Sequence, residues 1–243
     1  MDVADEKQSL RQMIWDLMER TNVASFPRPV HGRIPNFVGS RRAAENLAST
    51  EEFRRARVIK VNPDSPQRPV RELALRAGKL VLVPTPRLRG QFYLLDPSRV
   101  DPGYASSITG FTRVGEKIDV ESAPNIDLIV VGSVAVSPGG FRVGKGEGYS
   151  ELEYAMLREM GKVSDSTPIA TTVHDVQVVS DVPHMPYDVP VDIIATPTRV
   201  IRVSPRRPRP PGLLMEYLSD GKVQDTPYLK AYLQRTGRWP RRS

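Results

Sequence analysis

A glycine-rich loop holds the residues of this sequence that are best suited to chemistry. Five of the ten residues from 139 to 148 are glycine, and Arg142 and Lys145 lie among them. Glycines let backbone N–H groups approach an anion closely, and the two side chains supply counter-charge. An apolar run precedes the loop and a helical pattern follows it, so the sequence predicts a nucleotide-phosphate site. The alternative is a flexible loop whose charges are merely solvated.

The loop departs from both common nucleotide motifs. Gly139, Gly144 and Lys145 have the spacing of a P-loop, but Gly146 stands where that motif places the hydroxyl that holds Mg²⁺. Tyr149 stands where a Rossmann fingerprint has its third glycine. The spacing therefore indicates a phosphate site of another kind.

Alternating strand and helix patterns must position this loop. Near-continuous Val, Ile and Leu runs predict strands, and amphipathic segments between them predict helices. Such runs, separated by helices, indicate an α/β fold with an open, mostly parallel sheet and helices on both faces. The expected strands are 58–61, 79–83, 127–131 continued by 133–136, 168–173 and 191–195, with an extended segment at 176–179; the expected helices are 7–20, 40–56 capped by Ser40, 69–77 and 149–160.

The formal net charge of +7 is confined to the C-terminal part of the sequence. Residues 201–243 hold ten Lys and Arg against three Asp and Glu, so the other 200 residues are neutral overall. We therefore expect an α/β domain at 1–203 and a basic, Pro/Arg-rich extension at 204–243. The extension should begin with a stiff linker at 204–211 and continue with two short docking helices, at 213–218 and 228–233. The extension lacks the aromatic pattern of an RNA-binding module, so a solvated or body-docking tail is favoured over an RNA site.

Composition excludes several classes of protein. The absence of cysteine excludes disulfides, thiolate metal sites and thiol nucleophiles. No apolar run approaches the roughly 18 residues that a membrane-spanning helix needs. The acidic first residues do not form a signal peptide. We therefore expect a soluble, cytoplasmic protein with no membrane partner.

Three motifs resemble those of the 5-formyltetrahydrofolate cyclo-ligase (methenyltetrahydrofolate synthetase) family. Residues 142–151, Arg-Val-Gly-Lys-Gly-Glu-Gly-Tyr-Ser-Glu, resemble its signature R-L-G-x-G-x-G-Y-Y-D, and residues 7–11 resemble its N-terminal K-x-x-L-R. Residues 187–192 resemble its D-x-x-V-D. Further stretches resemble the subgroup of methenyltetrahydrofolate synthetase domain-containing proteins, whose animal members carry an RNA-recognition domain after this body; they are 32–37, 60–64, 82–89, 132–137, 173–175 and 196–201.

The resemblance implies a cyclo-ligase (NagB–RpiA–CoA-transferase-like) α/β fold and an ATP- and Mg²⁺-dependent reaction. ATP phosphorylates the formyl oxygen of 5-formyltetrahydrofolate, N10 attacks the activated carbon, and phosphate leaves as the 5,10-methenyl form closes. This chemistry needs a phosphate cradle and clamped reactants rather than an enzyme nucleophile. The resemblance assigns Glu151 and Asp188 to Mg²⁺, and Arg142, Lys145 and Tyr149 to catalysis. It assigns ATP to Lys7, Arg11, Gly140, Arg142, Gly144, Lys145, Gly146, Gly148 and Tyr149.

The substrate side is less well defined. Phe37 can stack on a pterin and Arg33 can clamp a carboxylate, although a loop pinned by Phe37 explains the same residues. His174 follows an apolar strand, where α/β sheets place ligands, yet a histidine bonded to the backbone is the alternative. Residues 64–67 lack the glutamate that contacts folate in the family. The expected substrate is thus a reduced folate or related pterin, with two alternatives: the same chemistry on a different pterin or pyrimidine-like compound, and a non-catalytic nucleotide- or RNA-binding relative.

Overall fold

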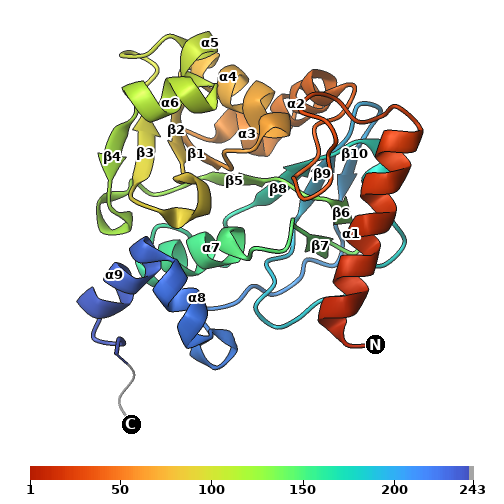
Figure 1. Ribbon diagram of the computed structural model, residues 1–243. Coiled ribbons are helices and arrows are strands. Elements are labelled where there is room, and N and C mark those ends of the chain that lie inside the picture. Colours follow the sequence, from red (N-terminus) through yellow and green to blue (C-terminus); the bar gives the residue numbers. More distant parts are fainter. Residues whose placement is uncertain (241–243) are drawn as a thin grey trace.

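The computed structural model describes residues 1–240, and an eight-stranded sheet lies at its centre (Figure 1). The strand order is β10-β9-β8-β5-β1-β2-β3-β4. Strands β9, β8, β5, β1 and β2 run parallel, while β3, β4 and β10 pair antiparallel at the two edges. This confirms the predicted α/β fold with a mostly parallel sheet. The bounds are β1 Val58–Val61, β2 Leu80–Val83, β3 Phe92–Leu95, β4 Glu116–Ile118, β5 Leu128–Val131, β8 Ile169–Thr172, β9 Ile193–Ala195 and β10 Val200–Arg202.

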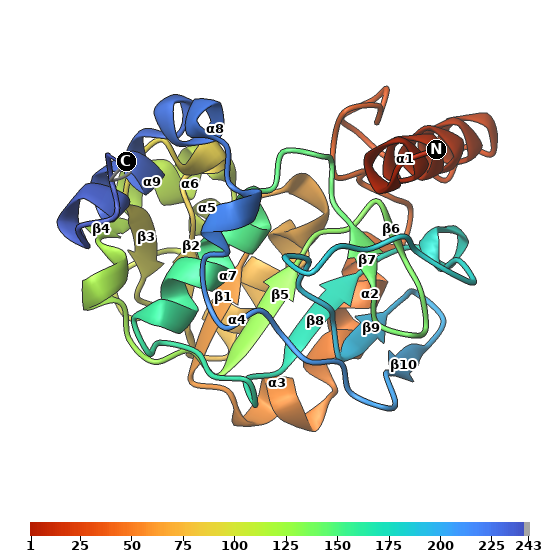
Figure 2. The same ribbon diagram turned by 90° about the horizontal axis from the view of Figure 1, so that it is seen from below.

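Helices cover both faces of this sheet (Figures 1 and 2). Ile59, Val81 and Val130 belong to the core on one face, whereas Leu82 and Ile129 belong to the core on the other. Because side chains alternate along a strand, each strand serves both layers, which explains the continuous apolar runs. One face carries α2 Ser40–Ala48, α3 Glu51–Arg55, α4 Arg68–Arg76, α5 Pro102–Ala105 and α6 Ile108–Val114; the other carries α7 Tyr149–Glu159, α8 Asp220–Asp225 and α9 Pro227–Arg235.

The first helix, α1 Val3–Arg20, lies beside the sheet against a small hairpin (Figure 2). Asp2 caps it by accepting a hydrogen bond from the Asp5 N–H at 2.8 Å. The hairpin consists of β6 Ala135–Val136 and β7 Arg142–Val143. A separate apolar cluster joins the two elements, and it includes Ile14, Trp15, Met18, Val134, Ala135 and Val143.

Two of the predicted elements are wrong in detail. The helix predicted at 40–56 is split in two, and Gly39 rather than Ser40 occupies the cap position of α2. Thr50 starts the second helix, where its Oγ1 accepts a hydrogen bond from the Phe53 N–H at 3.3 Å. Residues 133–136 do not extend β5, because the chain leaves the main sheet after Val131 and enters the β6–β7 hairpin.

The predicted extended segment at 176–179 and the predicted helix at 213–218 also differ from the structure. Residues Asp175–Gln177 form a 3₁₀ turn, after which Val178 makes a single bridge to Val136. Residues Met215–Tyr217 form only a 3₁₀ turn. Both segments are short, so local hydrophobic pattern does not determine their conformation.

The described part of the extension folds back over the α7 face of the sheet. Tyr228, Leu229, Tyr232 and Leu233 are buried in the core on that face. The Tyr232 hydroxyl donates to Glu159 Oε1 at 2.7 Å. The division at residues 203 and 204 stays a prediction, and residues 241–243 of the predicted extension lie outside the described residues. Between residues 1 and 240, no helix has both the length and the apolar composition needed to cross a membrane.

Candidate functional site

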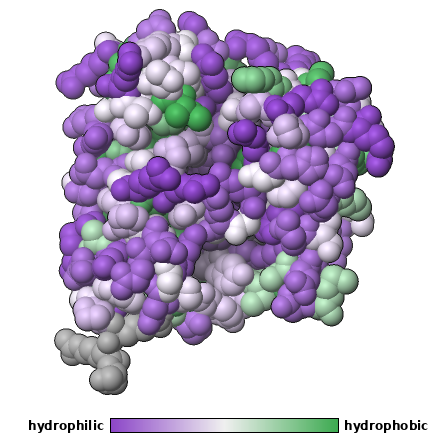
Figure 3. All heavy atoms as spheres, viewed as in Figure 1, coloured by the Kyte–Doolittle hydropathy of each residue, from purple (hydrophilic) through white to green (hydrophobic). Residues whose placement is uncertain are grey.

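Two cavities lie on either side of the glycine loop. The larger, of about 630 Å³, lies between α1, the loop and residues 210–222, and the smaller, of about 460 Å³, lies beyond the ends of β1 and β2. Figure 3 shows the face of the molecule that is seen in Figure 1; it is mostly hydrophilic and has a hollow near its middle. The cavities share five lining residues, which are Arg142, Gly144, Glu147, Gly148 and Glu151.

The position of the cavities follows from the sheet topology. Strands β1 and β5 are neighbours, but β1 leads to β2 on one side while β5 leads to β8 on the other. Open α/β sheets bind ligands at the carboxyl ends of strands where the connections diverge in this way. The residues after β1 and the loop that follows β5 therefore meet at one place.

The glycine loop connects β7 to the N-terminus of α7. Gly146 has φ +104° and Gly148 has φ +75°, a left-handed conformation that favours glycine. Gly148 occupies the cap position of α7 and contributes no side-chain cap. The residues of the first turn of this helix line the smaller cavity, and their N–H groups have no side-chain cap, so they are suited to bind an anion.

Arg142 fastens the base of the loop. Its side chain is buried, and its Nη2 donates to the Gly132 carbonyl at 2.6 Å and its Nε to Ser133 Oγ at 3.2 Å. Its Nη1 lies 2.9 Å from Glu151 Oε1. Arg142 thus links the end of β5 to the first turn of α7, and it fixes the orientation of the Glu151 carboxylate.

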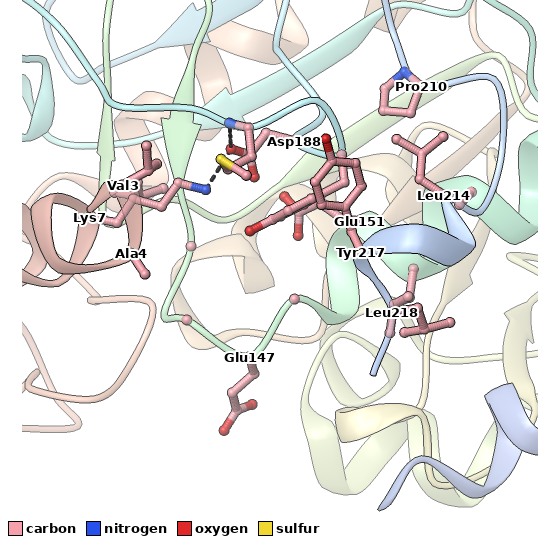
Figure 4. A pocket seen from close by; sticks show the side chains of 18 of the residues that line it. Val3, Ala4, Lys7, Glu147, Glu151, Asp188, Pro210, Leu214, Tyr217 and Leu218 are labelled. Carbon is pink, nitrogen blue, oxygen red and sulfur yellow. Dashed lines mark hydrogen bonds and ion pairs between the residues drawn. The ribbon is translucent and has the colours of Figure 1, made fainter. Parts of the chain in front are cut away.

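Two basic side chains of α1 reach the larger cavity. Lys7 and Arg11 are four residues apart and so lie on the same helix face, and both are buried. Lys7 Nζ lies 2.5 Å from Asp188 Oδ2, and Arg11 Nε donates to the Gly144 carbonyl at 2.6 Å. Burial lowers the pKa of Arg11, and the charges of Asp188 and Glu151 oppose that shift. Figure 4 shows Lys7 pointing toward Asp188 on the side of the cavity that α1 forms.

The donors in the larger cavity fit a magnesium ion that is held partly by a nucleotide. Glu151 and Asp188 both line this cavity. Mg²⁺ is usually held by one or two carboxylates, together with waters and substrate phosphates. Within residues 1–240, no group of three or more metal-ligating side chains comes together. Two carboxylates beside the glycine loop match that mode, whereas a site built from protein ligands alone does not fit.

Lys145 and Tyr149 border the smaller cavity, and Glu147 lies between them. Lys145 Nζ lies 3.4 Å from Glu147 Oε2, and Arg87 Nη2 lies 3.3 Å from Glu147 Oε1. Lys222 donates to the Glu147 carbonyl at 2.5 Å, and its Nζ lies 3.9 Å from the centre of the Tyr149 ring. Three cations from three parts of the chain thus surround Glu147.

Buried charged groups lie at the floor of the smaller cavity. Burial raises the pKa of Asp64, while Lys145 and Arg71 oppose that shift. Below it, Lys60 Nζ lies 2.5 Å from Glu153 Oε1, and both side chains are almost fully buried. Burial also raises the pKa of Glu153, and Lys60 opposes the shift.

Arg71 holds the segment that carries Asp64. Its guanidinium donates to the carbonyls of Asn62 at 2.6 Å, Asp64 at 3.1 Å and Ser106 at 2.8 Å. Burial lowers the pKa of Arg71 to about 9. Three backbone acceptors satisfy this buried cation, so the loop after β1 is anchored from below.

The structure brings most of the predicted site residues together. Arg33, Lys145 and Tyr149 line the smaller cavity together with the shared residues. Gly140 does not line either cavity, because it lies in the turn of the β6–β7 hairpin with φ +97°. The larger cavity collects Lys7, Arg11, Arg142, Gly144, Gly146, Gly148, Glu151 and Asp188.

Phe37 and His174 also lie outside both cavities. Phe37 is buried in the cluster beneath α1, and its ring centre lies 6.2 Å from that of His174 in an edge-on arrangement. His174 Nδ1 accepts a hydrogen bond from the Val176 N–H at 3.2 Å. Burial lowers the pKa of His174, and the neighbouring Asp175 opposes the shift.

Sequence reasoning missed several residues at or beneath the cavities. Lys60 and Glu153 carried a signal, because each places a charge where the strand or helix pattern expects burial. Asp64 comes shortly after the end of the strand predicted at 58–61, which is a typical ligand-binding position. Lys222 carried no such signal, because its contact depends on how the extension folds back.

Comparison with known proteins decides the family. The sequence profile of the 5-formyltetrahydrofolate cyclo-ligase family matches residues 3–197. This chain belongs to that family. Membership confirms the predicted resemblance.

The curated relatives are longer than this chain. The methenyltetrahydrofolate synthase domain-containing protein of Bos taurus is 47% identical over 236 residues, which cover 93% of this chain and 61% of the relative. The protein of the same name from Homo sapiens is 45% identical over 240 residues, which cover 94% and 62%. The chain therefore spans a little over three fifths of the length of these relatives.

A solved structure supports the fold. The 5,10-methenyltetrahydrofolate synthetase of Aquifex aeolicus superposes with a TM-score of 0.54 and 22% sequence identity. The match covers 83% of this chain and 94% of that one. At this identity the similarity concerns the architecture of the cyclo-ligase family alone.

Proposed function

We propose that this chain is an ATP- and Mg²⁺-dependent cyclo-ligase that converts 5-formyltetrahydrofolate, or a related formyl-pterin, to its 5,10-methenyl form. One observation carries the proposal: two cavities meet at a single glycine loop and share its residues. Phosphoryl transfer between two bound reactants requires them to be held end to end at such a point.

The larger cavity suits the nucleotide. The loop amides and the N-terminus of α7 provide donors for phosphate oxygens. Lys7 and Arg11 add positive charge from α1. Glu151 and Asp188 would hold the Mg²⁺, which when bound supplies charge neutralisation to the phosphates.

The smaller cavity suits the formyl-bearing substrate. Asp64 is a carboxyl group whose raised pKa favours hydrogen bonding to the ring nitrogens and amino group of a pterin. Arg33 and Arg87 line the same cavity, and guanidinium groups bind carboxylates such as a glutamate tail. Both ends of a reduced folate thus find complementary groups here.

The loop residues then have distinct roles in the reaction. Lys145 lines the smaller cavity next to the shared residue Gly144, and it would neutralise charge on the phosphoryl group as the formyl oxygen attacks it. Arg142 orients Glu151 through their ion pair. Tyr149 begins α7 and lies under Lys222, so it holds the loop close to the reactants. Ring closure by N10 then expels phosphate without an enzyme nucleophile.

The test is a turnover assay on the full chain. The protein is mixed with 5-formyltetrahydrofolate, ATP and Mg²⁺, and the absorbance of the methenyl product is followed. We expect product only when all three are present, and a fall in kcat of about 10²–10³-fold in Lys145→Ala, typical of the loss of one charge-stabilising group. Lys117→Ala, which changes an exposed lysine of β4, is the matched control.

Binding measurements separate the alternatives. If no product forms while an ATP analogue still binds with Mg²⁺, the folate assignment is wrong and the same chemistry on a different pterin or pyrimidine-like substrate is favoured. If Lys145→Ala turns over at the rate of the wild type, the assignment of the loop to phosphoryl transfer is wrong.

A further inference from the structure

One wall of the larger cavity comes from outside the region that defines the family. The family profile ends at residue 197. The relatives from Bos taurus and Homo sapiens match 93% and 94% of this chain, so their similarity includes most of the extension. The residues of this wall are Pro210, Leu213, Leu214, Tyr217, Leu218 and Lys222.

We propose that residues 210–222 form a nucleobase-binding wall, and that Lys222 holds the glycine loop from the same side. The inference rests on the proposed function, since a nucleotide whose phosphates bind the loop is what brings a base to this wall. The base is of the purine type, a planar ring with apolar faces, and it would lie in the part of the cavity that the extension encloses.

The distribution of charge along the cavity supports this assignment. Lys7, Glu151 and Asp188 cluster at the glycine loop, where phosphates and metal would lie. Leu214 and Leu218 lie across the cavity from the residues of α1, as Figure 4 shows. A nucleotide bound by its phosphates at the polar end would therefore place its base against the apolar end.

Aliphatic and aromatic surfaces are both present at that end. Leu152 and Ala155 of α7 continue the aliphatic surface of Leu214. Tyr217 and Tyr187 lie with their ring centres 5.4 Å apart and tilted by 59°. Apolar and aromatic walls of this kind are typical of pockets that bind flat ligands.

The two tyrosines remain accessible although they lie in a recess. Tyr217 is 46% exposed and Tyr187 is 37% exposed. Lys7 Nζ lies 5.3 Å from the centre of the Tyr187 ring, so the aromatic pair adjoins the phosphate-binding cations. Exposed aromatic surface beside charged groups marks a place where a ligand can be buried.

The wall is held in place by anchors outside the cavity. Leu229 and Tyr232 of α9 are fully buried, and the Val120 N–H donates to the Tyr228 hydroxyl at 2.8 Å. Lys222 extends from α8 to the loop, where its Nζ contacts the Glu147 carbonyl and the Tyr149 ring. An ammonium group over an aromatic ring is attractive, so this contact ties the extension to the loop.

The first experiment tests the base. Titration calorimetry on the full chain with Mg²⁺ uses two probes, a non-hydrolysable ATP analogue and inorganic tripolyphosphate. We expect the double variant Leu214→Ala and Tyr217→Ala to raise the Kd of the analogue by about tenfold or more, since base stacking is lost. The Kd of tripolyphosphate should change by less than about twofold. Tyr104→Ala removes a tyrosine of similar exposure, 42%, on α5 and is the matched control.

The second experiment tests Lys222 as a positioning residue. Lys222→Met should raise the Kd of both probes, because the loop itself loses its support. Lys230→Met is the control, since its ammonium group pairs with Gln224 at 2.8 Å on the same extension. A Kd that rises for the analogue alone, or for neither probe, contradicts the role of Lys222.

The outcomes separate this inference from the proposed function. If the wild type binds the analogue and the double variant binds it equally well, the base lies elsewhere and the wall has no such role, while the proposed function stands. If the double variant raises the KM for the folate substrate and leaves the analogue Kd unchanged, the wall belongs to the acceptor and the inference is again wrong. If the wild type binds no nucleotide, the proposed function itself fails.

Discussion

The two cavities that meet at the glycine loop are built from different parts of the chain. The smaller one is lined by residues that follow β1 and β2, inside the region that the family profile matches. The larger one also uses α1 and residues 210–222. In the proposed function, the sheet therefore fixes the substrate side, whereas peripheral segments complete the nucleotide side.

The cavities also differ in how their charges are satisfied. In the larger one, Lys7 pairs with Asp188, and Arg11 bonds to a loop carbonyl. In the smaller one, Glu153 is also paired, with Lys60, but burial raises the pKa of Asp64. Paired charges favour a charged ligand, such as a metal-bound phosphate, which can replace one partner of each ion pair. A carboxyl group with a raised pKa favours a neutral heterocycle.

The largest effect should come from removing the side chain of Arg142, which lines both cavities. Arg142→Met removes the ion pair to Glu151 and the bonds to Gly132 and Ser133. Removing one partner of a buried pair costs about 3–5 kcal/mol, so we expect the free energy of unfolding to fall by that amount. Binding at both cavities should weaken together, as measured by denaturant unfolding and by titration with each reactant.

Arg55→Met provides the control for this prediction. Arg55 is an exposed partner of Glu51 and lines neither cavity, and exposed ion pairs contribute about 0–1 kcal/mol. If Arg142→Met lost only nucleotide binding and kept folate binding and stability, the two cavities would not both depend on Arg142.

The sequence predicted the parts of this arrangement that depend on local patterns, and it missed parts that depend on contacts between residues far apart in the sequence. The parallel strands were predicted correctly because strands buried on both faces are continuously apolar, as in Leu128–Val131. The edge strands Phe92–Leu95 and Glu116–Ile118 were not predicted. The second of them is short and largely exposed, so it has no apolar pattern. The hairpin Ala135–Val143 was not predicted either, because its two-residue strands leave no periodic pattern.

The site was predictable where residues lie close in sequence. The glycine loop and Glu151 belong to one local motif, and Lys7 and Arg11 share a helix face. The burial of Arg142 was not predictable, because its partners depend on the geometry of the hairpin. Lys222 lies 75 residues from the Glu147 carbonyl to which it donates, and no local pattern records such a contact.

An intermediate effect should be limited to the larger cavity. Arg11→Met removes a charge-assisted hydrogen bond to the Gly144 carbonyl and a cation near the phosphates. Such bonds contribute about 1.5–3 kcal/mol, so we expect the Kd of an ATP analogue to rise roughly ten- to hundredfold. Arg20→Met, at the exposed end of the same helix, should leave this Kd unchanged. An equal rise in the KM for the folate substrate would contradict the separation of the cavities.

The smallest effect should be limited to the smaller cavity and should carry a pH signature. Asp64→Asn removes a carboxyl group that would bond to the substrate, so we expect kcat/KM for the folate to fall roughly tenfold while the Kd of the ATP analogue is unchanged. Because burial raises the pKa of Asp64, the folded protein binds this proton more tightly than the unfolded chain does. Wild-type stability is therefore lost as the pH rises from the unfolded pKa, about 3.9, through the folded pKa.

The Asp64→Asn variant does not lose this stability, because it has no carboxyl group at position 64. Its stability relative to the wild type should therefore rise as the pH increases from the unfolded pKa to the folded pKa of Asp64. Asp96 provides the opposite case, since the hydroxyl and N–H of Ser98 lower the pKa of its carboxyl. Stability from such a group is present above its unfolded pKa and lost as the pH falls through its folded pKa, so Asp96→Asn should fall behind the wild type as the pH rises. Both variants are followed by thermal unfolding between pH 2 and pH 8, a range that includes the pH below the unfolded pKa of an aspartate. Parallel trends in the two variants would show that the Asp64 carboxyl is not destabilised by burial. An Asp64→Asn variant that is more stable yet less active on folate would show that this carboxyl is retained for the substrate.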